Sequence, residues 1–392
     1  MSKYQIKSNK LSAKQKLEQR QEIFATEKFS ALFNVAELPV EKVSAKNCEN
    51  LIGSVEIPVG IAGDVDLQFS QKEKQTYRVL LATTEGALIA STARGLKAIN
   101  QAGGAQVFVK KIGMSRAPVF ELESGKAARK FEQWLKENFA EIKEITEKTS
   151  NHLELLEVKT WIRGKYVFAR FVFDTQQAMG MNMVTIALRQ LWQEKLKDYP
   201  KIKLISLSSN VCVDKKPSGI NRLLGRGYQA QAEVVLTTEL VRKVLKIEPE
   251  NLAKIHKIKN LIGSNVAESL AQNMHQANVL AAMFLATGQD VAHVVEAAQG
   301  ATTIELQADE KIYAAVNLPN LNLGTVGGGT YLPAFKQARE LMNENLTPEE
   351  LAGIMAATCL AAELSGLAAL ATHSLASAHQ KLGREQKSEE KC

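Results

Sequence analysis

The stretch Ser-Ser-Asn-Val-Cys-Val-Asp-Lys-Lys-Pro-Ser-Gly-Ile, residues 208–220, is the one around which the chain is organised. Pro217 has no N–H group and biases Lys216 toward an extended backbone, so the side chains of Lys215 and Lys216 are expected to point to opposite sides. Asp214 is placed to orient the ammonium of Lys215. From these residues alone, a solvated turn with a charge pair is the simplest interpretation.

Composition describes a soluble globular protein with two or three domains. The chain has 392 residues, of which 45% are hydrophobic and 23% are charged. The net charge of +7 suits an anionic partner, but only 6% of the residues are aromatic and no basic run interleaves with them. A small anionic molecule therefore fits at least as well as nucleic acid.

The cysteines predict a cytoplasmic protein, and the apolar stretches predict that it has no membrane segment. The four cysteines are far apart and no signal peptide is visible, which predicts free thiols, no structural zinc and a reducing cytoplasm. The most apolar stretch, 351–378, is interrupted by Glu363 and His373, so it predicts a buried helix, with no membrane span or anchor.

Outward from the lysine stretch, toward the N-terminus, lies a predicted compact α+β unit at 117–206. Its expected strands are 106–111 leading in and 161–173 within, and its expected helices are 125–139 and 183–199. Ala-Met-Gly-Met-Asn-Met, 178–183, joins strand to helix, and Gly180 there permits a flat ligand to approach the backbone. Core filling by the methionines is the alternative.

Before this unit, residues 1–50 predict a helical arm with a capping box at Ser12 and Gln15. A second body begins near residue 51 with short apolar runs and a strand at 76–81.

A helix is expected from Thr83 or Thr84 to the glycine pair at Gly103, with Glu85 in its first turn. A carboxylate there complements the helix dipole, and acid chemistry near neutral pH would require burial or a second carboxylate.

After the lysine stretch, a helix is predicted over 265–287, followed at once by Asp290. His275, Asn278 and Asp290 would then line one side of an apolar rod, where buried polar groups need partners. The glycine-rich 324–330 lacks the Walker lysine and the Rossmann spacing but lets a backbone approach a phosphate.

The last expected helix, 348–380, carries His379, either as a surface residue or as part of a lid that reaches the site when substrate binds.

Taken together, these motifs resemble the 3-hydroxy-3-methylglutaryl-coenzyme A (HMG-CoA) reductase family, class I, which includes the eukaryotic and archaeal enzymes. The resemblance covers roughly residues 47–384, and no membrane segment precedes it, unlike in animal members. Any one motif is weak, but the set in the family's order is very specific. It consists of Glu-Asn-Leu-Ile-Gly with Pro-Val-Gly-Ile-Ala-Gly, Ala-Thr-Thr-Glu-Gly, Gly-Met-Ser-Arg, Ala-Met-Gly-Met-Asn-Met, Asp-Lys-Lys-Pro, Gly-Gln-Asp and Gly-Thr-Val-Gly-Gly-Gly-Thr.

The resemblance implies a reaction and roles for four residues. The family reduces HMG-CoA to mevalonate and CoA by two hydride transfers from a nicotinamide cofactor, with no metal. Lys215 would stabilise the oxyanion, Glu85 would donate a proton, Asp290 would tune this pair and His379 would protonate the departing thiolate. The two carboxylates and the ammonium would titrate as one coupled system.

The resemblance also implies binding residues. Those for the substrate are Ser91, Arg116, Ser208, Asn210, Lys216, Lys259, His275 and Asn278. Those for the cofactor are Ser150, Asn151, Gln177, Met179, Gly180, Met181, Asn182, Thr185, Gly327 and Gly328.

The implied fold is α+β. It has a helical N-terminal segment (1–50), a large substrate domain around a long central helix (51–116 with 218–392), an inserted small ferredoxin-like, non-Rossmann cofactor domain (117–206) and the lysine loop (207–217). The family's sites form between subunits, so we expect a homodimer or a homotetramer in which the lysine loop of one subunit faces Glu85 and Asp290 of another.

Three positions depart from the family pattern. Gln177 stands where aspartate is usual, and Ser150-Asn151 stands where serine and arginine contact the extra phosphate of NADPH, so NADPH is favoured only modestly over NADH. Glu385 replaces a serine that is phosphorylated in animal relatives.

Other functions remain as alternatives. A CoA-dependent acyl transferase would show no nicotinamide turnover, a binding paralogue would show no turnover at all, and a nucleic-acid binder would show salt-dependent binding. The same site could also oxidise mevalonate.

Overall fold

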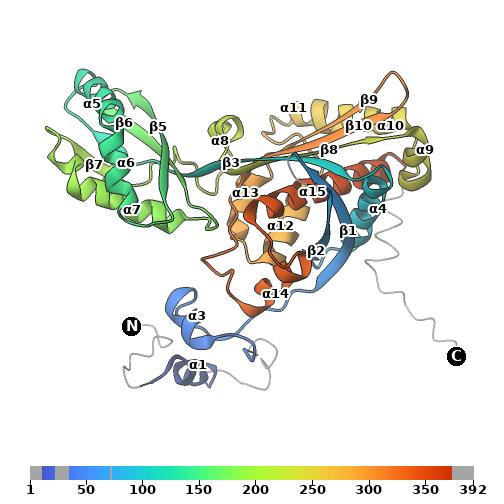
Figure 1. Ribbon diagram of the computed structural model, residues 1–392, viewed down its shortest axis with the longest axis horizontal. Coiled ribbons are helices and arrows are strands. Elements are labelled where there is room, and N and C mark those ends of the chain that lie inside the picture. The colour runs from blue at the N-terminus through green and yellow to red at the C-terminus, as the bar shows by residue number, and fades with distance from the viewer. Residues whose placement is uncertain (1–10, 23–34, 71–72, 373–392) are drawn as a thin grey trace.

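Three clusters of buried apolar side chains hold the described chain together, and they correspond to the three parts visible in Figure 1. The computed structural model describes residues 11–22, 35–70 and 73–372. The largest cluster fills a large lobe, the second fills a small lobe made by residues 114–207, and the third joins two N-terminal helices to the large lobe through Leu332.

The large lobe is built around helix α15 (Pro348–Ala371). A capping box between Thr347 and Glu350 starts this helix, and Pro348 occupies its first turn. The helix is apolar on all sides because it is covered on all sides, chiefly by α4 (Leu88–Gln101), α12 (Gln276–Thr287) and the sheet. By length and composition α15 could cross a membrane, but 89% of its apolar window is buried within the protein, as expected for a core helix.

A sheet of ten strands runs through both lobes, and strand β3 (Ala105–Arg116) connects them. Residues 105–113 of β3 pair with the strands of the large lobe, whereas 114–116 pair with β6 in the small lobe. The strands of the large lobe are β1 (Val59–Phe69), β2 (Gln75–Ala82), β8 (Gly227–Leu236), β9 (Ala301–Leu306) and β10 (Ile312–Leu321).

The small lobe is a four-stranded antiparallel sheet in the order β7-β4-β6-β5, with helices between its strands. Along the chain it comprises β4 (Val119–Glu121), α5 (Gly125–Glu137), α6 (Phe139–Glu147), β5 (Glu154–Arg163), β6 (Tyr166–Asp174), α7 (Met181–Glu194), η2 (Leu196–Asp198) and β7 (Lys203–Ser206). Its core, which includes Phe120, Phe131 and Phe171, is separate from that of the large lobe.

Shorter elements complete the described chain. The N-terminal helices are α1 (Ala13–Gln21) and α3 (Val40–Lys46). The large lobe adds α8 (Gly219–Leu224), α9 (Thr238–Leu240), η3 (Val241–Leu245), α10 (Pro249–His256), η4 (Lys257–Gly263), α11 (Ser264–Val266), η5 (Val291–His293), α13 (Val294–Ala297) and α14 (Pro333–Met342).

Several predicted elements are confirmed. The reciprocal capping box at Ser12 and Gln15 is present, with hydrogen bonds of 2.9 and 3.1 Å. The strands at 76–81 and 106–111 lie within β2 and β3. Cys48, Cys212 and Cys359 are free thiols.

Two predicted elements are wrong in extent, and one can be compared only in part. The single strand over 161–173 is a hairpin, because Gly164 takes a positive φ of 58° and turns the chain between β5 and β6. The helix expected over 265–287 begins only at Gln276, because the N–H groups of Met274 and His275 donate instead to Glu363 of α15. The last helix is confirmed over Pro348–Ala371, and residues 373–380 of its predicted extent lie outside the described residues.

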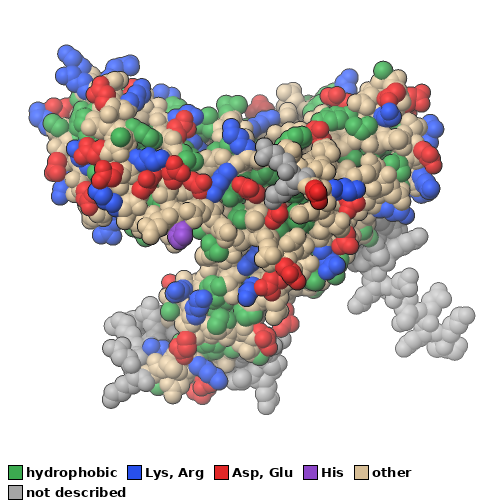
Figure 2. Space-filling view, viewed as in Figure 1, with side chains coloured by type: hydrophobic (Ala, Val, Ile, Leu, Met, Phe, Trp, Pro, Cys, Tyr) green, Lys and Arg blue, Asp and Glu red, His purple; other side chains and the backbone are tan. Residues whose placement is uncertain are grey.

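The charge on the face shown in Figure 2 is mixed. On the face shown in Figure 2, basic and acidic side chains are interspersed over both lobes. Such a distribution does not form the basic stripe that nucleic-acid binding typically requires.

Candidate active site

The lysine loop, residues 207–217, joins β7 to α8 and places Lys215 beside Asp290. The Lys215 Nζ lies 2.6 Å from Asp290 Oδ2, and the two side chains are 40% and 37% exposed. The ion pair is therefore accessible to a ligand.

The loop has an unusual backbone. Asn210, Val213 and Lys215 have φ values of 64°, 46° and 57°. A positive φ is uncommon outside glycine, above all for a β-branched residue such as valine, and it persists only where the surroundings fix it. Two side chains from elsewhere do so. Asn221 donates to the carbonyl of Val213 (2.9 Å), and Glu296 accepts from the N–H of Lys215 (3.1 Å).

One expectation for this loop is wrong, and the physical basis of a second one changes. Asp214 does not orient Lys215. Its carboxylate lies 3.1 Å from Arg226 Nη1 and 3.9 Å from Arg116 Nη1. Because Lys215 is left-handed, the alternation of an extended chain does not apply to it, although the Lys216 ammonium does have a different partner, the carbonyl of Asp214 (3.2 Å).

Asp290 is held as a carboxylate. It caps η5 by accepting from the N–H of Ala292 (3.1 Å). Burial alone would raise the pKa of Asp290, but the hydrogen bond from Lys215, the charge of His293 and the Ala292 N–H together hold that pKa below its ordinary value. The Lys215 ammonium consequently faces a fixed negative charge.

A cavity of about 700 Å³ opens beside this pair. Lys215, Asp290 and His293 line it, together with residues 178–183 and 326–330. Its size suits a small-molecule ligand.

The two stretches that contain glycines and line the cavity, 178–183 and 326–330, lie side by side. The carbonyl of Gln177 accepts from the N–H of Thr325 (2.9 Å), and Ala178 pairs with Val326 as an isolated bridge. A Cβ on Gly324 would lie 2.5 Å from the Met179 backbone nitrogen, so only glycine fits there. The side-chain amide of Gln289 bonds both the N–H and the carbonyl of Gly324, each at 3.0 Å.

This wall fits a flat ligand with an anionic group. Gly327 and Gly328 have positive φ values of 82° and 54° and open space where a side chain would be. Gly180 caps the N-terminus of α7, and Met181 and Asn182 of its first turn line the cavity. The positive end of the helix dipole there favours a phosphate.

Glu85 lies before α4 and not in its first turn, contrary to prediction. The helix begins at Leu88 after Ala87 takes a φ of 72°, and the N–H of Glu85 donates to Thr83 Oγ1 (3.0 Å). The carboxylate instead accepts from the side-chain amide of Asn278 (2.8 Å). The helix dipole therefore does not explain this acid.

The described chain forms two separate half-sites. We call Lys215 with Asp290 the lysine half-site, and Glu85 with His275 and Asn278 the glutamate half-site. Asn278 is near the start of α12 and Asp290 follows its end, and the helical rise from 278 to 287 alone is about 14 Å. None of the three residues of the glutamate half-site lines the cavity. Lys215 and Asp290 of the same chain lie together here, and the expectation that the site combines the lysine loop of one subunit with residues of another stays a prediction.

Other predicted substrate residues lie on several elements. Ser91 of α4 shares a hydrogen bond of 2.9 Å with Ser365 of α15, and Lys259 is exposed on η4. The Nε2 of His275 is buried and has no hydrogen-bond partner within the described chain, as is expected of a group that awaits a ligand.

On the lysine side, Ser208 Oγ lies 3.5 Å from the Cys212 sulfur, and Asn210 is exposed. The Nε of Arg116 is buried and likewise lacks a hydrogen-bond partner in the part of the chain that is described.

Some predicted cofactor residues are not brought to the cavity. Thr185 donates back to the carbonyl of Met181 (2.9 Å), and Ser150 Oγ accepts from the N–H of His152 (3.2 Å). Asn151 and the side chain of Gln177 are exposed. None of these four residues lines the cavity, and His379 lies outside the described residues.

The sequence analysis did not identify His293, Glu296 and Arg226, which lie around Asp214. A signal was present, because Asp290, His293 and Glu296 follow one another at intervals of three residues, a spacing that places side chains on one face of a helical turn.

Comparison with known proteins agrees with these features. A model of the hydroxymethylglutaryl-coenzyme A reductase family matches residues 12–384. The 3-hydroxy-3-methylglutaryl-coenzyme A reductase of Haloferax volcanii is 45% identical over 343 residues, which cover 86% of this chain and 84% of the relative. That of Methanocaldococcus jannaschii is 43% identical over 354 residues, 88% of this chain and 86% of the relative.

A eukaryotic relative and a solved structure extend the comparison. Reductase 2 of Dictyostelium discoideum is 40% identical, covering 90% of this chain and 69% of the relative. The class II reductase of Streptococcus pneumoniae, solved with NADPH, has a TM-score of 0.69 at 20% identity and covers 92% of this chain and 98% of that one. At this identity the solved structure supports the fold alone.

Proposed function

The chain belongs to the HMG-CoA reductase family, and we propose that its two half-sites together carry the family's reaction. This oxidoreductase reaction of the mevalonate pathway converts the thioester of HMG-CoA to the primary alcohol of mevalonate and releases CoA. The observation that carries the assignment of residues is the Lys215–Asp290 pair, 2.6 Å apart at the edge of a ligand-sized cavity.

Lys215 would stabilise the carbonyl oxygen as it becomes negative. A fixed ammonium in a partly enclosed site favours that charge more than water does, because it need not reorient during the reaction. Asp290 holds the ammonium in place through a short ion pair.

Glu85 would supply the proton that the new alcohol oxygen takes up, with Asn278 orienting its carboxyl group. A bound nicotinamide would supply hydride to the carbonyl carbon. In the first reduction the oxyanion would re-form a carbonyl as the carbon–sulfur bond breaks with its electrons on sulfur, which leaves an aldehyde for the second hydride to reduce, and we assign the protonation of the thiolate to His379.

The acidic end of the substrate would bind Arg116, Ser208 and Lys216 from the lysine side and Lys259 from η4. The Nε of Arg116, which has no hydrogen-bond partner among the described residues, supports this assignment, because it would gain one from the ligand. His275, whose Nε2 likewise has no partner among them, would line the same site. Ser91 and Asn210 are assigned to the same substrate.

The cofactor would lie across residues 178–183 and 326–330. Their glycine-lined wall and the N-terminus of α7 support a nicotinamide ring with phosphates. We favour NADPH over NADH, but only modestly, because Asn151 offers no positive charge to the 2′-phosphate that distinguishes NADPH. Ser150, Gln177 and Thr185 would contact the cofactor only if it extends beyond the cavity.

We infer that the small lobe is the cofactor domain (117–206), of the ferredoxin-like type. Its strand order β7-β4-β6-β5 and its helix-connected antiparallel topology support that type. The remainder, 51–116 with 218–392, would bind the substrate, and 1–50 would form the helical N-terminal segment.

We also propose a homodimer or homotetramer that works in the cytoplasm. The separation of the half-sites supports a composite site between copies. Exposed apolar side chains near the substrate segments support an interface, namely Val55, Ile57, Val59, Ile61, Ile258, Ile262 and Val266. The free thiols support a reducing compartment.

The test is to follow the absorbance of NADPH, and separately of NADH, with purified protein and HMG-CoA. We expect two cofactors to be oxidised per CoA released, and Lys215→Ala to abolish this turnover in a folded protein. A folded wild-type protein that oxidises neither cofactor would contradict the proposal, and substantial activity of Lys215→Ala would remove the lysine from its role.

A further inference from the structure

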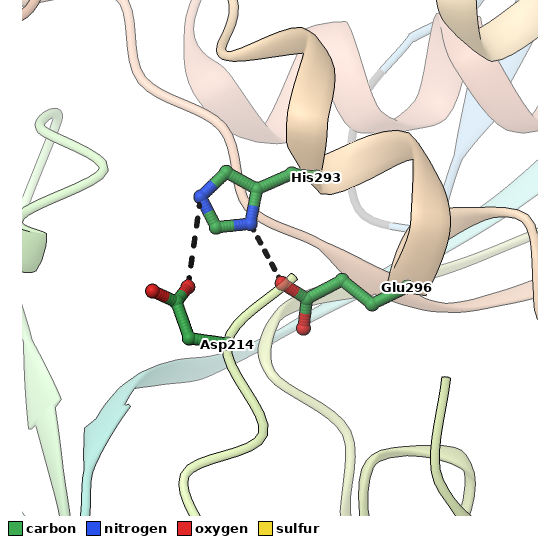
Figure 3. Close-up of side chains that lie close together, drawn as sticks. All are labelled: Asp214, His293 and Glu296. Carbon is green, nitrogen blue, oxygen red and sulfur yellow. Dashed lines mark hydrogen bonds and ion pairs between the residues drawn. The ribbon is translucent and has the colours of Figure 1, made fainter. Parts of the chain in front are cut away.

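A buried cluster lies directly behind the Lys215–Asp290 pair. Figure 3 shows His293 between two carboxylates, with its Nδ1 2.6 Å from Glu296 Oε1 and its Nε2 3.9 Å from Asp214 Oδ1. His293 and Glu296 have no exposed side-chain surface. The Nε2 of His293 also lies 3.8 Å from Asp290 Oδ2.

The cluster is not a cation site, although its ligand atoms lie within 4.8 Å of one another. The guanidinium of Arg226, itself fully buried, is 2.8 Å from Glu296 and 3.1 Å from Asp214. A positive charge therefore already fills the position between the carboxylates, and a metal ion would have to displace it.

Glu296 is the centre of this cluster. Its Oε1 accepts from the backbone N–H of Lys215 (3.1 Å), from Arg226 (2.8 Å) and from His293 (2.6 Å). Its Oε2 accepts from Asn221 (2.8 Å), and the same amide of Asn221 donates to the carbonyl of Val213. One carboxylate thus fixes, directly or through Asn221, both left-handed positions that flank Asp214.

This arrangement has an energetic consequence for the lysine. A left-handed residue other than glycine costs of order 1–2 kcal/mol, so the loop would relax without the contacts that oppose it. Relaxation at residues 213 and 215 would move the Lys215 ammonium away from Asp290, because the side chain follows its own backbone. Small displacements of a charged group at a reacting centre are costly in rate.

We propose that Glu296 and His293 are positioning residues for the reaction assigned above. Glu296 holds the backbone of Lys215 in its left-handed conformation, and His293 lies between Glu296 and Asp290. The two buried residues together fix the positions of both members of the Lys215–Asp290 ion pair. The inference rests on the proposed function, since it concerns the same lysine and aspartate.

The test compares Glu296→Gln and His293→Asn with the wild type in steady-state kinetics. His293→Asn retains a side-chain donor near Glu296 but removes the nitrogen that faces Asp290. We expect kcat to fall by about 10- to 100-fold in each variant, with KM for HMG-CoA changed by less than about threefold.

The pH dependence of kcat distinguishes a positioning role of His293 from a purely structural role. Asp290 faces the charges of Lys215 and His293, and His293 in turn faces Glu296, Asp214 and, across them, Arg226. Removing the histidine removes a positive charge that lowers the pKa of Asp290. The acid limb of the pH profile, which is the range where kcat falls as the pH decreases, should therefore lie at higher pH in His293→Asn than in the wild type.

Glu350→Gln is the matched control, because it removes a different buried carboxylate, one that caps α15 away from the loop. It should lose stability but keep the acid limb of the wild type. Near-normal kcat in both test variants, or a loss of kcat with an unmoved acid limb in His293→Asn, would overturn the inference while leaving the function intact. A wild-type protein without turnover would overturn both.

Discussion

Two buried histidines of this chain have opposite surroundings. His293 has carboxylate oxygens at 2.6, 3.8 and 3.9 Å. His256 of α10 is only 3% exposed, and its Nδ1 faces the side-chain amide of Asn260 at 3.4 Å. Burial lowers the pKa of His256 to about 4. His293 lies beside Asp290 of the candidate site, whereas His256 lowers the stability of the fold in acid.

We predict that His256 makes the protein lose stability as the pH falls below neutrality. Its pKa of about 4 in the folded state lies under the ordinary 6.5, so between these values the unfolded chain binds the extra proton. Its contribution is fully favourable above pH 6.5 and should diminish by about 2 kcal/mol between pH 8 and pH 5. Denaturant unfolding across this range measures it.

The control is His256→Gln, which cannot be protonated. Other groups titrate alike in both proteins, so the difference between their pH profiles isolates the histidine. Parallel profiles for wild type and variant would contradict the assignment.

At the scale of elements, local sequence predicted what local interactions determine. The capping box at Ser12 uses atoms three residues apart and was visible in the sequence. The start of α12 was not, because Glu363 of the distant α15 takes the N–H groups of Met274 and His275. Nor was the position of Glu85, whose partner Asn278 belongs to another helix. Each error arises from a long-range contact that overrides helix propensity.

The packing of α4 on α15 gives a prediction at this scale. A Cβ on Gly95 would lie 1.9 Å from the carbonyl oxygen of Ala361 in α15. The neighbouring Arg94 binds the same helix by donating to the carbonyl of Ser365 (2.6 Å). Gly95→Ala must therefore separate the two helices. We expect a loss of at least about 1–3 kcal/mol in the free energy of unfolding, measured by denaturant titration.

Gly219→Ala provides the comparison, because a Cβ there meets nothing within 4 Å. In α8 the added methyl group should change stability by no more than about 1 kcal/mol and favour the helix. If the two alanine variants were equally stable, α4 and α15 would not be packed as closely as described.

At the scale of the whole molecule, the sequence identified the candidate residues but not their grouping. Resemblance to a family placed Asp290 with Glu85 and opposite the lysine, whereas the structure pairs Asp290 with Lys215 in one chain and leaves Glu85 with Asn278. The spacing of residues along a sequence does not indicate whether a side chain faces its own subunit or another one. The fold adds that α12 separates the two half-sites, which predicts that each half-site works with one from a second copy.

This grouping predicts how inactive variants should complement each other. If the lysine half-site of one subunit works with the glutamate half-site of another, a dimer of one Lys215→Ala chain and one Glu85→Gln chain contains one intact site of two. Unfolding and refolding an equal mixture makes about half of the dimers mixed, so about a quarter of wild-type activity should return. The same experiment with Lys215→Ala and Asp290→Asn should restore nothing, because both residues belong to one half-site and every pairing then lacks one of them. Recovery in this second mixture would mean that Asp290 serves the lysine of the other subunit. Failure of the first mixture, with mixed dimers verified by differently tagged chains, would mean that Glu85 and Lys215 act within one chain.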